Sequence, residues 1–201
     1  MNIWNKLKER SIKMETELKR LQLGNDNFVD NELTNSNQDS VRRNDVVGGQ
    51  KPFAVVLTCS DSRVVPELMF DTGIGELFVI RVAGNIANTS SIASIEYAVA
   101  HLNISLIVVL GHQNCGAVTS ALAGSDSGKN LDHLLHFVKP AISSSKSTIV
   151  DEVSTIHAKL TAEKLISDST IISDAIDHAK VKIVPAFYSL ESGKVNFFEY
   201  I

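Results

Sequence analysis

The stretch FAVVLTCSDSR, residues 53–63, decides the fold of this chain. Its first six residues form a nearly unbroken apolar run that is partly β-branched, which is typical of a strand covered on both faces of a parallel sheet. The runs 77–81 and 104–110 have the same character. Repetition of such runs along the chain predicts an α/β fold around a mainly parallel β-sheet flanked by helices.

Helical patterns separate and follow these expected strands. Residues 90–102 carry apolar side chains at helical spacing, and Ser90 or Ser91 is the expected cap. The order strand, helix, strand predicts a right-handed crossover between parallel strands. A further helix is expected to begin near Asn114, just after the third strand.

The last part of the sequence combines a helical region with a hairpin. Helices are expected from about residue 131 to residue 180, with a break near Pro140. The segments 181–190 and 195–200 are expected to pair as a β-hairpin around the turn ESGK. Pro185 marks a bend or an edge position in that hairpin.

The N-terminal segment has a different character. Apolar side chains recur at steps of three and four from Trp4 to Leu21, which predicts a helix with one mostly apolar face. Gly24 is its expected C-terminal stop. The following residues, 25–51, are rich in Asn, Asp, Ser and Gly, so we expect an irregular arm that lies over another part of the molecule or over a partner subunit.

Length and charge limit the classes of function. A chain of 201 residues, 44% hydrophobic, fits one domain, which we divide into an N-terminal helix and arm (1–51) and an α/β core (52–201). Lys and Arg total 19 against 23 for Asp and Glu, so neither nucleic acid nor a membrane is an expected partner. The sequence has no secretory signal pattern and no apolar run approaching about 20 residues, so we expect a cytoplasmic protein.

Cysteine and histidine follow two of the expected strands. Cys59 comes directly after residues 53–58, and His112 with Cys115 follows residues 104–110. Neighbouring parallel strands bring their carboxyl ends together at the edge where α/β sheets bind ligands. Two cysteines and one histidine are a set that zinc takes when its fourth position stays open for water or substrate. The alternative is that both cysteines are small buried hydrophobes and the histidine a satisfied polar residue.

Two charged residues follow Cys59 closely. Asp61 could be a fourth metal ligand or could hydrogen-bond a zinc-bound hydroxide, and Arg63 could hold Asp61 through a bidentate ion pair. The alternative is an ordinary surface pair in a turn. Spacing excludes three other uses of the cysteines. A cysteine phosphatase needs its Arg six residues after the Cys, a redox C-x-x-C pair is absent, and a zinc ribbon needs two paired knuckles.

Four motifs in this order resemble a β-class carbonic anhydrase: CSDSRV (59–64), FVIRVAGN (78–85), IEYAV (95–99) and GHQNCGAV (111–118). The resemblance is dense over roughly residues 24–123 and loose in the C-terminal KIVPAFYSLESGKV. It implies an α/β fold, one zinc ion per subunit, and reversible hydration of carbon dioxide to bicarbonate and a proton by zinc-bound hydroxide. It also implies a homodimer as the basic unit.

The resemblance assigns roles to the residues already singled out. Cys59, His112 and Cys115 match the zinc ligands of the family. Asp61 and Arg63 match a pair in which the Asp either binds zinc, which closes the site, or pairs with the Arg and leaves water on the metal.

The resemblance also implies residues of a substrate site. Gln50 matches a glutamine that helps to form this site in part of the family. Phe78, Ala83 and Gly116 fall where the family lines its pocket with apolar side chains and a backbone N–H, although Ala83 replaces a larger Val of some members. Val56 stands where a Trp marks the subgroup that has an inhibitory bicarbonate pocket, so the resemblance places this chain outside that subgroup.

Two alternatives stay open at this point. A hydrolase of a carbon dioxide analogue, such as carbon disulfide, would keep the same metal ligands. A non-catalytic zinc protein could use the metal for assembly alone, but it would have no use for Asp61, Arg63 and Gln50. In every case we expect the N-terminal helical arm to pack on a partner subunit, within a homodimer or a tetramer.

Overall fold

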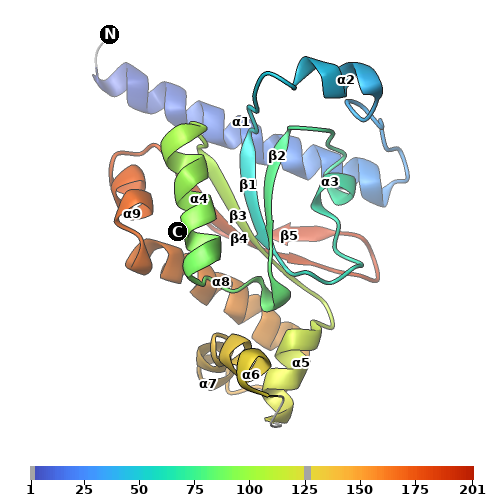
Figure 1. The fold of residues 1–201 in the computed structure, drawn as a ribbon, viewed down its shortest axis with the longest axis vertical. Helices are drawn as coiled ribbons and strands as arrows, with labels where there is room; N and C mark the ends of the chain where they lie inside the picture. The colour runs from blue at the N-terminus through green and yellow to red at the C-terminus, as the bar shows by residue number, and fades with distance from the viewer. Residues whose placement is uncertain (1–2, 125–127) are drawn as a thin grey trace.

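The computed structural model describes residues 3–124 and 128–201, with residues 3–8 described by their backbone alone. Its centre is a five-stranded sheet with the strand order β2-β1-β3-β4-β5 (Figure 1). The strands are β1 (Ala54–Thr58), β2 (Leu77–Arg81), β3 (Leu106–His112), β4 (Lys182–Tyr188) and β5 (Val195–Phe197). Strands β2, β1, β3 and β4 are parallel, and β5 is antiparallel to β4. The predicted α/β fold around a mainly parallel sheet is confirmed.

Helices cover both faces of the sheet and one of its ends. The helices that the structure describes are α1 (Ile3–Val29), α2 (Ser40–Asp45), α3 (Pro66–Met69), the 3-10 helix η1 (Ala83–Asn85), α4 (Thr89–His101), α5 (Gly116–Ala123), α6 (Lys129–His136), α7 (Lys139–Ser145), α8 (Val150–Asp168) and α9 (Thr170–Asp177). Helices α4, α8 and α9 cover one face, α1 and α3 pack on the other, and α5 to α7 gather at one end of the sheet (Figure 1). Among the described helices, none has the length and apolar character that crossing a membrane requires.

The burial of β1 explains its sequence. Val55 and Leu57 belong to the apolar cluster with α4, α8 and α9, whereas Val56 belongs to the cluster with α1 and α3. All five residues of the strand are buried. A strand that is covered on both faces needs no polar side, which is why residues 53–58 form a nearly continuous apolar run.

Helix α4 begins slightly before the predicted cap. Asn88 is the N-cap residue, and its side chain accepts a hydrogen bond of 2.9 Å from the backbone N–H of Ser91. The Ser91 hydroxyl in turn accepts a bond of 2.9 Å from the backbone N–H of Asn88. Ser91 therefore belongs to the capping box as the third residue of the helix and not as its N-cap. The prediction of Ser90 or Ser91 as the cap residue was wrong.

The C-terminal region agrees with its predicted elements. Helix α6 ends at His136 and α7 begins at Lys139, so the break near Pro140 is confirmed. The predicted hairpin is formed by β4 and β5, but β4 lies between two strands and Pro185 is not at the edge of the sheet. The Pro185 carbonyl accepts a bond of 2.9 Å from the N–H of Phe198, on the β5 side. The Pro185 nitrogen also faces the β5 side, just past the residues that pair with β5. The missing N–H of this proline therefore does not remove a hydrogen bond between β4 and β3.

The N-terminal helix is longer than its sequence predicts. Gly24 lies inside α1, which continues to Val29, so the prediction of Gly24 as a stop was wrong. A Cβ on Gly24 would lie 1.9 Å from the carbonyl oxygen of Phe70. The glycine therefore allows α1 to cross the backbone at the end of α3 at very close range.

The arm after α1 is bound to its own chain. Asp71 accepts a hydrogen bond of 3.0 Å from the backbone N–H of Thr34, and the Arg42 guanidinium donates to the carbonyl oxygen of Ile74 at 2.9 Å. The arm also contains the short helix α2, which the sequence did not predict. Asp39 caps α2, and none of its residues is buried. Packing of the arm on a partner subunit remains a prediction.

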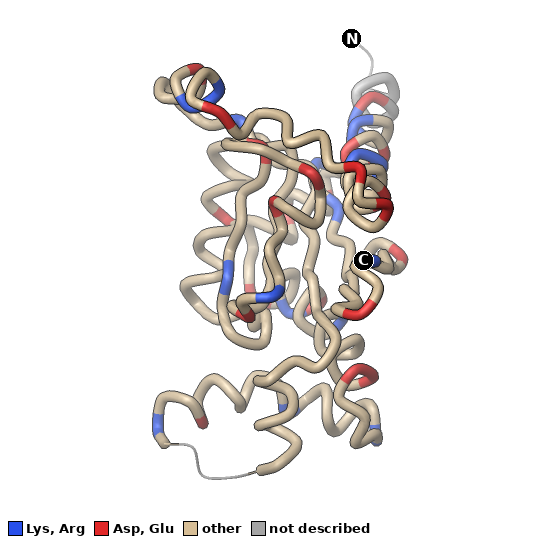
Figure 2. Tube along the Cα trace, turned by 90° about the vertical axis from the view of Figure 1, so that its right-hand side faces the viewer, with Lys and Arg blue, Asp and Glu red and all other residues tan. Residues whose placement is uncertain are grey.

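The apolar face of α1 packs against the sheet of the same chain. Met14 and Leu21 are fully buried on this face, and Leu18 is half-buried. One turn beyond Leu21, the Asn25 amide donates to the carbonyl oxygen of Gly193 at 2.9 Å and accepts from the Val195 N–H at 2.7 Å. These bonds tie α1 to the start of β5. Elsewhere on the helix, acidic and basic residues alternate and do not form a block of one sign (Figure 2).

Replacement of Gly24 by alanine should destabilise the protein, although alanine is the better helix former. The added Cβ would overlap the Phe70 carbonyl oxygen, and forcing backbone apart in a packed region costs about 1–3 kcal/mol. Thermal unfolding at fixed protein concentration measures the effect. Gly48→Ala is the matched control, because a Cβ at Gly48 has no atom within 4 Å. An unfolding midpoint of Gly24→Ala at or above that of the wild type would contradict the expected steric overlap.

Candidate metal centre

The candidate site lies at the carboxyl ends of β1 and β3. These strands are parallel neighbours, with Thr58 in register with Leu110. Cys59 follows β1 directly and His112 is the last residue of β3. In the sheet, β2 lies on one side of β1 and β3 lies on the other. The strand order therefore reverses between β1 and β3, and the ends of these two strands flank that point. Open α/β sheets bind their ligands at this point.

Three potential metal ligands converge there. The sulfur atoms of Cys59 and Cys115 and a ring nitrogen of His112 all lie within 4.8 Å of one another, and all three residues are buried. Zinc at about 2.3 Å from each of two thiolates would hold the sulfurs about 3.8 Å apart in tetrahedral geometry, which is compatible with this spacing. The sequence-based expectation that these residues meet is confirmed.

His112 presents one nitrogen to the site. Its Nδ1 lies 2.9 Å from the carbonyl oxygen of Gln113, to which it donates when it carries the proton. The lone pair is then on Nε2, which is buried and has no hydrogen-bond partner among the residues that the structure describes. Buried polar atoms in native proteins are nearly always satisfied, so an unpartnered imidazole nitrogen beside two thiols fits a metal ligand.

The two cysteines influence each other strongly. The hydrogen bond from the Cys115 thiol lowers the pKa of Cys59, and the Gly84 N–H, 3.2 Å from the Cys59 sulfur, lowers it further. The same thiol bond, together with burial, raises the pKa of Cys115. One thiolate thus forms readily, whereas the second needs a positive charge beside it, which a divalent cation would supply.

Asp61 and Arg63 form the bidentate pair that the sequence suggested as one possibility. Arg63 Nε donates to Asp61 Oδ1 at 2.9 Å, and Nη2 donates to Oδ2 at 2.8 Å. These bonds from Arg63 hold the pKa of Asp61 well below its usual range. Asp61 Oδ2 lies 4.0 Å from His112 Nε2, beside the metal ligands but outside their compact group. The carboxylate therefore stays ionised and is held by Arg63.

The predicted substrate-site residues fall into two groups. Ala83 lies in η1 next to Gly84, and Gly116 begins α5 next to Cys115, so both adjoin the ligand group. Phe78 is paired with Val55 near the start of β2, away from its carboxyl end, and its ring contacts Tyr97 at a centroid distance of 6.4 Å. A single chain does not bring Phe78 to the metal ligands.

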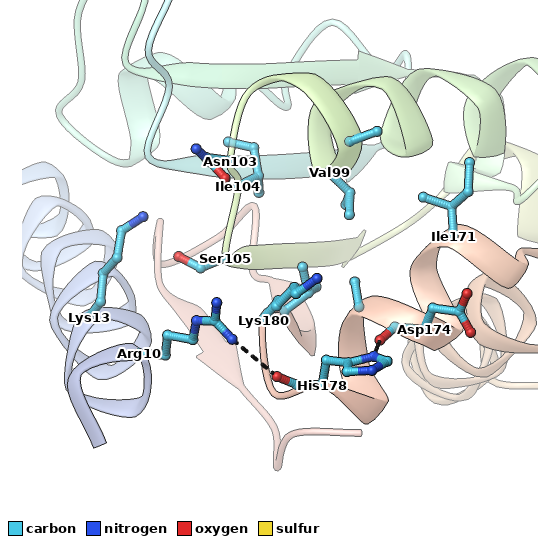
Figure 3. Close-up of a pocket in the computed structure, with 13 residues that line it drawn as sticks. Arg10, Lys13, Val99, Asn103, Ile104, Ser105, Ile171, Asp174, His178 and Lys180 are labelled. Atoms are coloured by element: carbon cyan, nitrogen blue, oxygen red, sulfur yellow. Dashed lines mark hydrogen bonds between the residues drawn. The ribbon is translucent and has the colours of Figure 1, made fainter. Parts of the chain in front are cut away.

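Gln50 lies at the opposite end of the sheet. It precedes β1 and lines a cavity of about 450 Å³ together with Lys13 and His101. A second cavity of about 720 Å³ opens at the same end, where Ser105 precedes β3 (Figure 3). Arg10 borders this second cavity and donates to the His178 carbonyl at 3.3 Å. Neither cavity includes a residue of the Cys2His group.

Several residues around the ligands were not predicted from the sequence. Arg81 donates to the carbonyl oxygens of Asp61 at 2.7 Å and of Cys59 at 3.3 Å. Asp151 on α8 accepts a bond of 2.8 Å from the N–H of Asn114, between the two ligands of the second loop. His157 on α8 is buried and lies against Gly84. For His157, a sequence signal was the helical spacing of the polar residues Ser154, His157 and Thr161 along the buried side of α8.

Comparisons with known proteins agree with this arrangement. The family model for carbonic anhydrases matches residues 54–195. Carbonic anhydrase 2 of Mycobacterium tuberculosis is 37% identical over 190 residues, covering 91% of this chain and 92% of that protein. The carbonic anhydrase of Mycolicibacterium smegmatis is 37% identical over 185 residues, covering 89% and 90%.

Solved structures show the same fold. A tetrameric β-carbonic anhydrase of Sordaria macrospora superposes with a TM-score of 0.73 at 26% identity, over 79% of this chain and 87% of that one. The Coccomyxa β-carbonic anhydrase in complex with acetazolamide gives a TM-score of 0.74 at 25% identity, over 81% and 79%. With its buried Cys2His group at the strand ends, this chain belongs to the carbonic anhydrase family of enzymes, in its β class.

Proposed function

We propose that this chain catalyses the reversible hydration of carbon dioxide to bicarbonate and a proton, with zinc held by Cys59, His112 and Cys115. The observation that carries the proposal is the Nε2 of His112, which has no hydrogen-bond partner in the described part of the chain and lies beside two buried thiols and a carboxylate held by arginine. Three protein ligands leave a fourth position open, as in catalytic zinc sites. When bound, zinc lowers the pKa of water from 15.7 to about 7 and so supplies a nucleophile at neutral pH.

Asp61 would orient the attacking water. Its Oδ2 is 4.0 Å from His112 Nε2, so the carboxylate borders the point on which the ligands converge. Because Arg63 keeps Asp61 ionised, the carboxylate accepts a hydrogen bond and does not donate one. A water that donates one hydrogen to Asp61 directs an oxygen lone pair away from it, toward the carbon of the substrate.

The start of α5 would stabilise the negative charge that develops on the substrate oxygens. Cys115 is the N-cap of this helix, and the backbone N–H groups of Ala117 and Val118 partly oppose the rise in its pKa that Cys59 and burial cause. The N–H of Gly116 lies beside them at the positive end of the helix. Ala83, in η1 beside Gly84, would add an apolar wall for a neutral, apolar gas.

The proposed assembly is a homodimer or a tetramer. Gln50 lies at the amino end of β1, so it could contribute to a substrate site only at the metal centre of another subunit. The Sordaria macrospora relatives are tetrameric, which supports an oligomer here. A cytoplasmic location is also proposed, because a reducing compartment keeps the free Cys59 and Cys115 available to a metal.

Stopped-flow hydration of carbon dioxide by the zinc-loaded protein tests the proposed function. We expect activity at least about 1,000-fold above that of the chelator-treated protein, rising between about pH 6 and pH 9 as water deprotonates. Acetazolamide, bound by the Coccomyxa relative, should inhibit it. Hydrolysis of carbon disulfide without hydration of carbon dioxide would favour the analogue hydrolase, and inactivity toward both would favour a non-catalytic zinc protein.

A further inference from the structure

His157 is a buried polar residue for which the proposed mechanism has no role. It lies on α8 with 2% of its surface exposed, and its Nε2 is 2.7 Å from the carbonyl oxygen of Gly84. Since a carbonyl oxygen only accepts, Nε2 must carry the hydrogen in this contact. Burial lowers the pKa of His157, in keeping with a neutral imidazole of defined tautomer.

Gly84 connects His157 to a metal ligand. Its N–H donates to the Cys59 sulfur at 3.2 Å, while its carbonyl oxygen receives the His157 bond. Its backbone has φ of +69°, a conformation that other residues rarely adopt, and a Cβ would lie 3.1 Å from the Ala117 methyl. A glycine has little intrinsic preference between backbone conformations, so outside contacts must hold its two peptide groups in place.

We propose that His157 is a positioning residue of the metal centre, which holds the Gly84 carbonyl so that the Gly84 N–H points at the Cys59 sulfur. The inference rests on the proposed binding of a metal by Cys59. It adds to that proposal a residue that touches neither metal nor substrate and acts through one glycine. Side chains of this kind, one contact behind the ligands, commonly set ligand orientation and metal affinity.

The rest of α8 supports such a role. Asp151, nearly two turns before His157, accepts the N–H of Asn114 at 2.8 Å, in the loop that carries the other two ligands. Gly111 packs against the same helix, since a Cβ there would lie 3.0 Å from the carbonyl oxygen of Ser154. One helix therefore contacts the loop that carries His112 and Cys115, and His157 connects the same helix to Cys59 through Gly84.

The electronic consequence concerns the Cys59 sulfur. An N–H that donates to a thiolate withdraws charge from the sulfur, so the sulfur donates less charge to a bound metal. If the Gly84 N–H turns away, the thiolate becomes a stronger donor and its orientation is no longer fixed. Both changes are measurable on a metal-loaded protein without any assay of carbon dioxide hydration.

The test compares His157→Leu with His157→Gln in the full-length protein. In His157→Leu we expect the thiolate-to-metal charge-transfer band of the cobalt(II)-loaded protein to move to longer wavelength. Zinc affinity, measured by competition with a chromophoric chelator, should fall about tenfold or more. In His157→Gln both properties should return close to the wild type, because the Gln amide carries an N–H at a similar distance from the backbone. A wild-type band and affinity in His157→Leu, or a Gln variant no better than Leu, would overturn the proposal.

Two further measurements separate positioning from general stability. Leu165→Ala, fully buried two turns further along α8, weakens the core without contact to Gly84. It should keep the wild-type cobalt spectrum, and an equal shift in this control would refute a specific role for His157. If His157→Leu does not fold, ¹⁵N NMR of the wild-type imidazole decides. A proton on Nε2 supports the proposal, and a proton on Nδ1 overturns it.

Discussion

Replacing His112 with alanine should leave less than about a tenth of an equivalent of zinc on the protein and lower carbon dioxide hydration by at least about 1,000-fold. The variant loses the only neutral ligand of the group. The two remaining thiolates repel each other, and this repulsion adds to the hydrogen bond with Cys59 and to burial in raising the pKa of Cys115. Without bound metal, the pKa of water stays near 15.7. Elemental analysis after gel filtration gives the metal content, and stopped flow gives the rate.

The matched control for this variant is His133→Ala. His133 is an exposed histidine on α6 and does not belong to the Cys2His group. It should keep a full equivalent of zinc and the wild-type rate. Cys115→Ser should behave like His112→Ala, because a serine hydroxyl does not ionise near neutral pH and is a poor zinc ligand. A full equivalent of zinc in His112→Ala would show that the ligands are assigned wrongly.

Asp61→Asn should lower kcat/KM for carbon dioxide about 100-fold while zinc stays bound. The amide has nearly the shape of the carboxylate, but it has one acceptor oxygen where Arg63 now engages two. It also removes the negative charge beside His112 Nε2, so an attacking water is left with a weaker, neutral acceptor. Stopped flow on samples of known zinc content separates this loss from loss of metal.

Arg63→Ala tests the same pair through its pH dependence. The hydrogen bonds from Arg63 keep the pKa of Asp61 below its usual range, so without them this pKa should rise toward the ordinary value. The ionised form is needed for catalysis, so activity should decline at a higher pH than in the wild type as the solution is acidified. Asp45→Asn and Arg43→Ala, both exposed on α2, are the controls for charge. Wild-type rates and an unchanged pH profile in both site variants would remove this pair from the mechanism.

The sheet and the metal ligands could be predicted because each depends on a local pattern. Strands covered on both faces give nearly unbroken apolar runs, so β1 and β2 were found with their bounds almost correct. At the ends of the apolar runs that precede Cys59 and Cys115, the sequence changes abruptly from apolar to polar residues. Parallel pairing then brings the two ends together, which is a rule of the fold and needs no knowledge of distant contacts.

The features that were missed depend on contacts between distant segments. Gly24 was taken as a helix stop, because nothing near it in sequence shows that α1 crosses the backbone of Phe70. His157 meets Gly84 across 73 residues, and only the packing of α8 makes that contact. Gln50 was expected at the substrate site because it matches a glutamine of the family, and its role there remains a prediction. An extended segment of nine residues spans about 30 Å, so the separation of Gln50 from Cys59 places it at the other end of the sheet.

The side chain of Asn25 has a consequence for handling the protein. Strand β5 is an edge of the sheet, and an unprotected edge presents free backbone groups to which other chains can pair. The Asn25 amide occupies two such groups, the carbonyl of Gly193 and the N–H of Val195. A recombinant fragment that begins after Asn25 would keep every metal ligand but leave this edge open. Such a fragment would aggregate for a reason unrelated to catalysis.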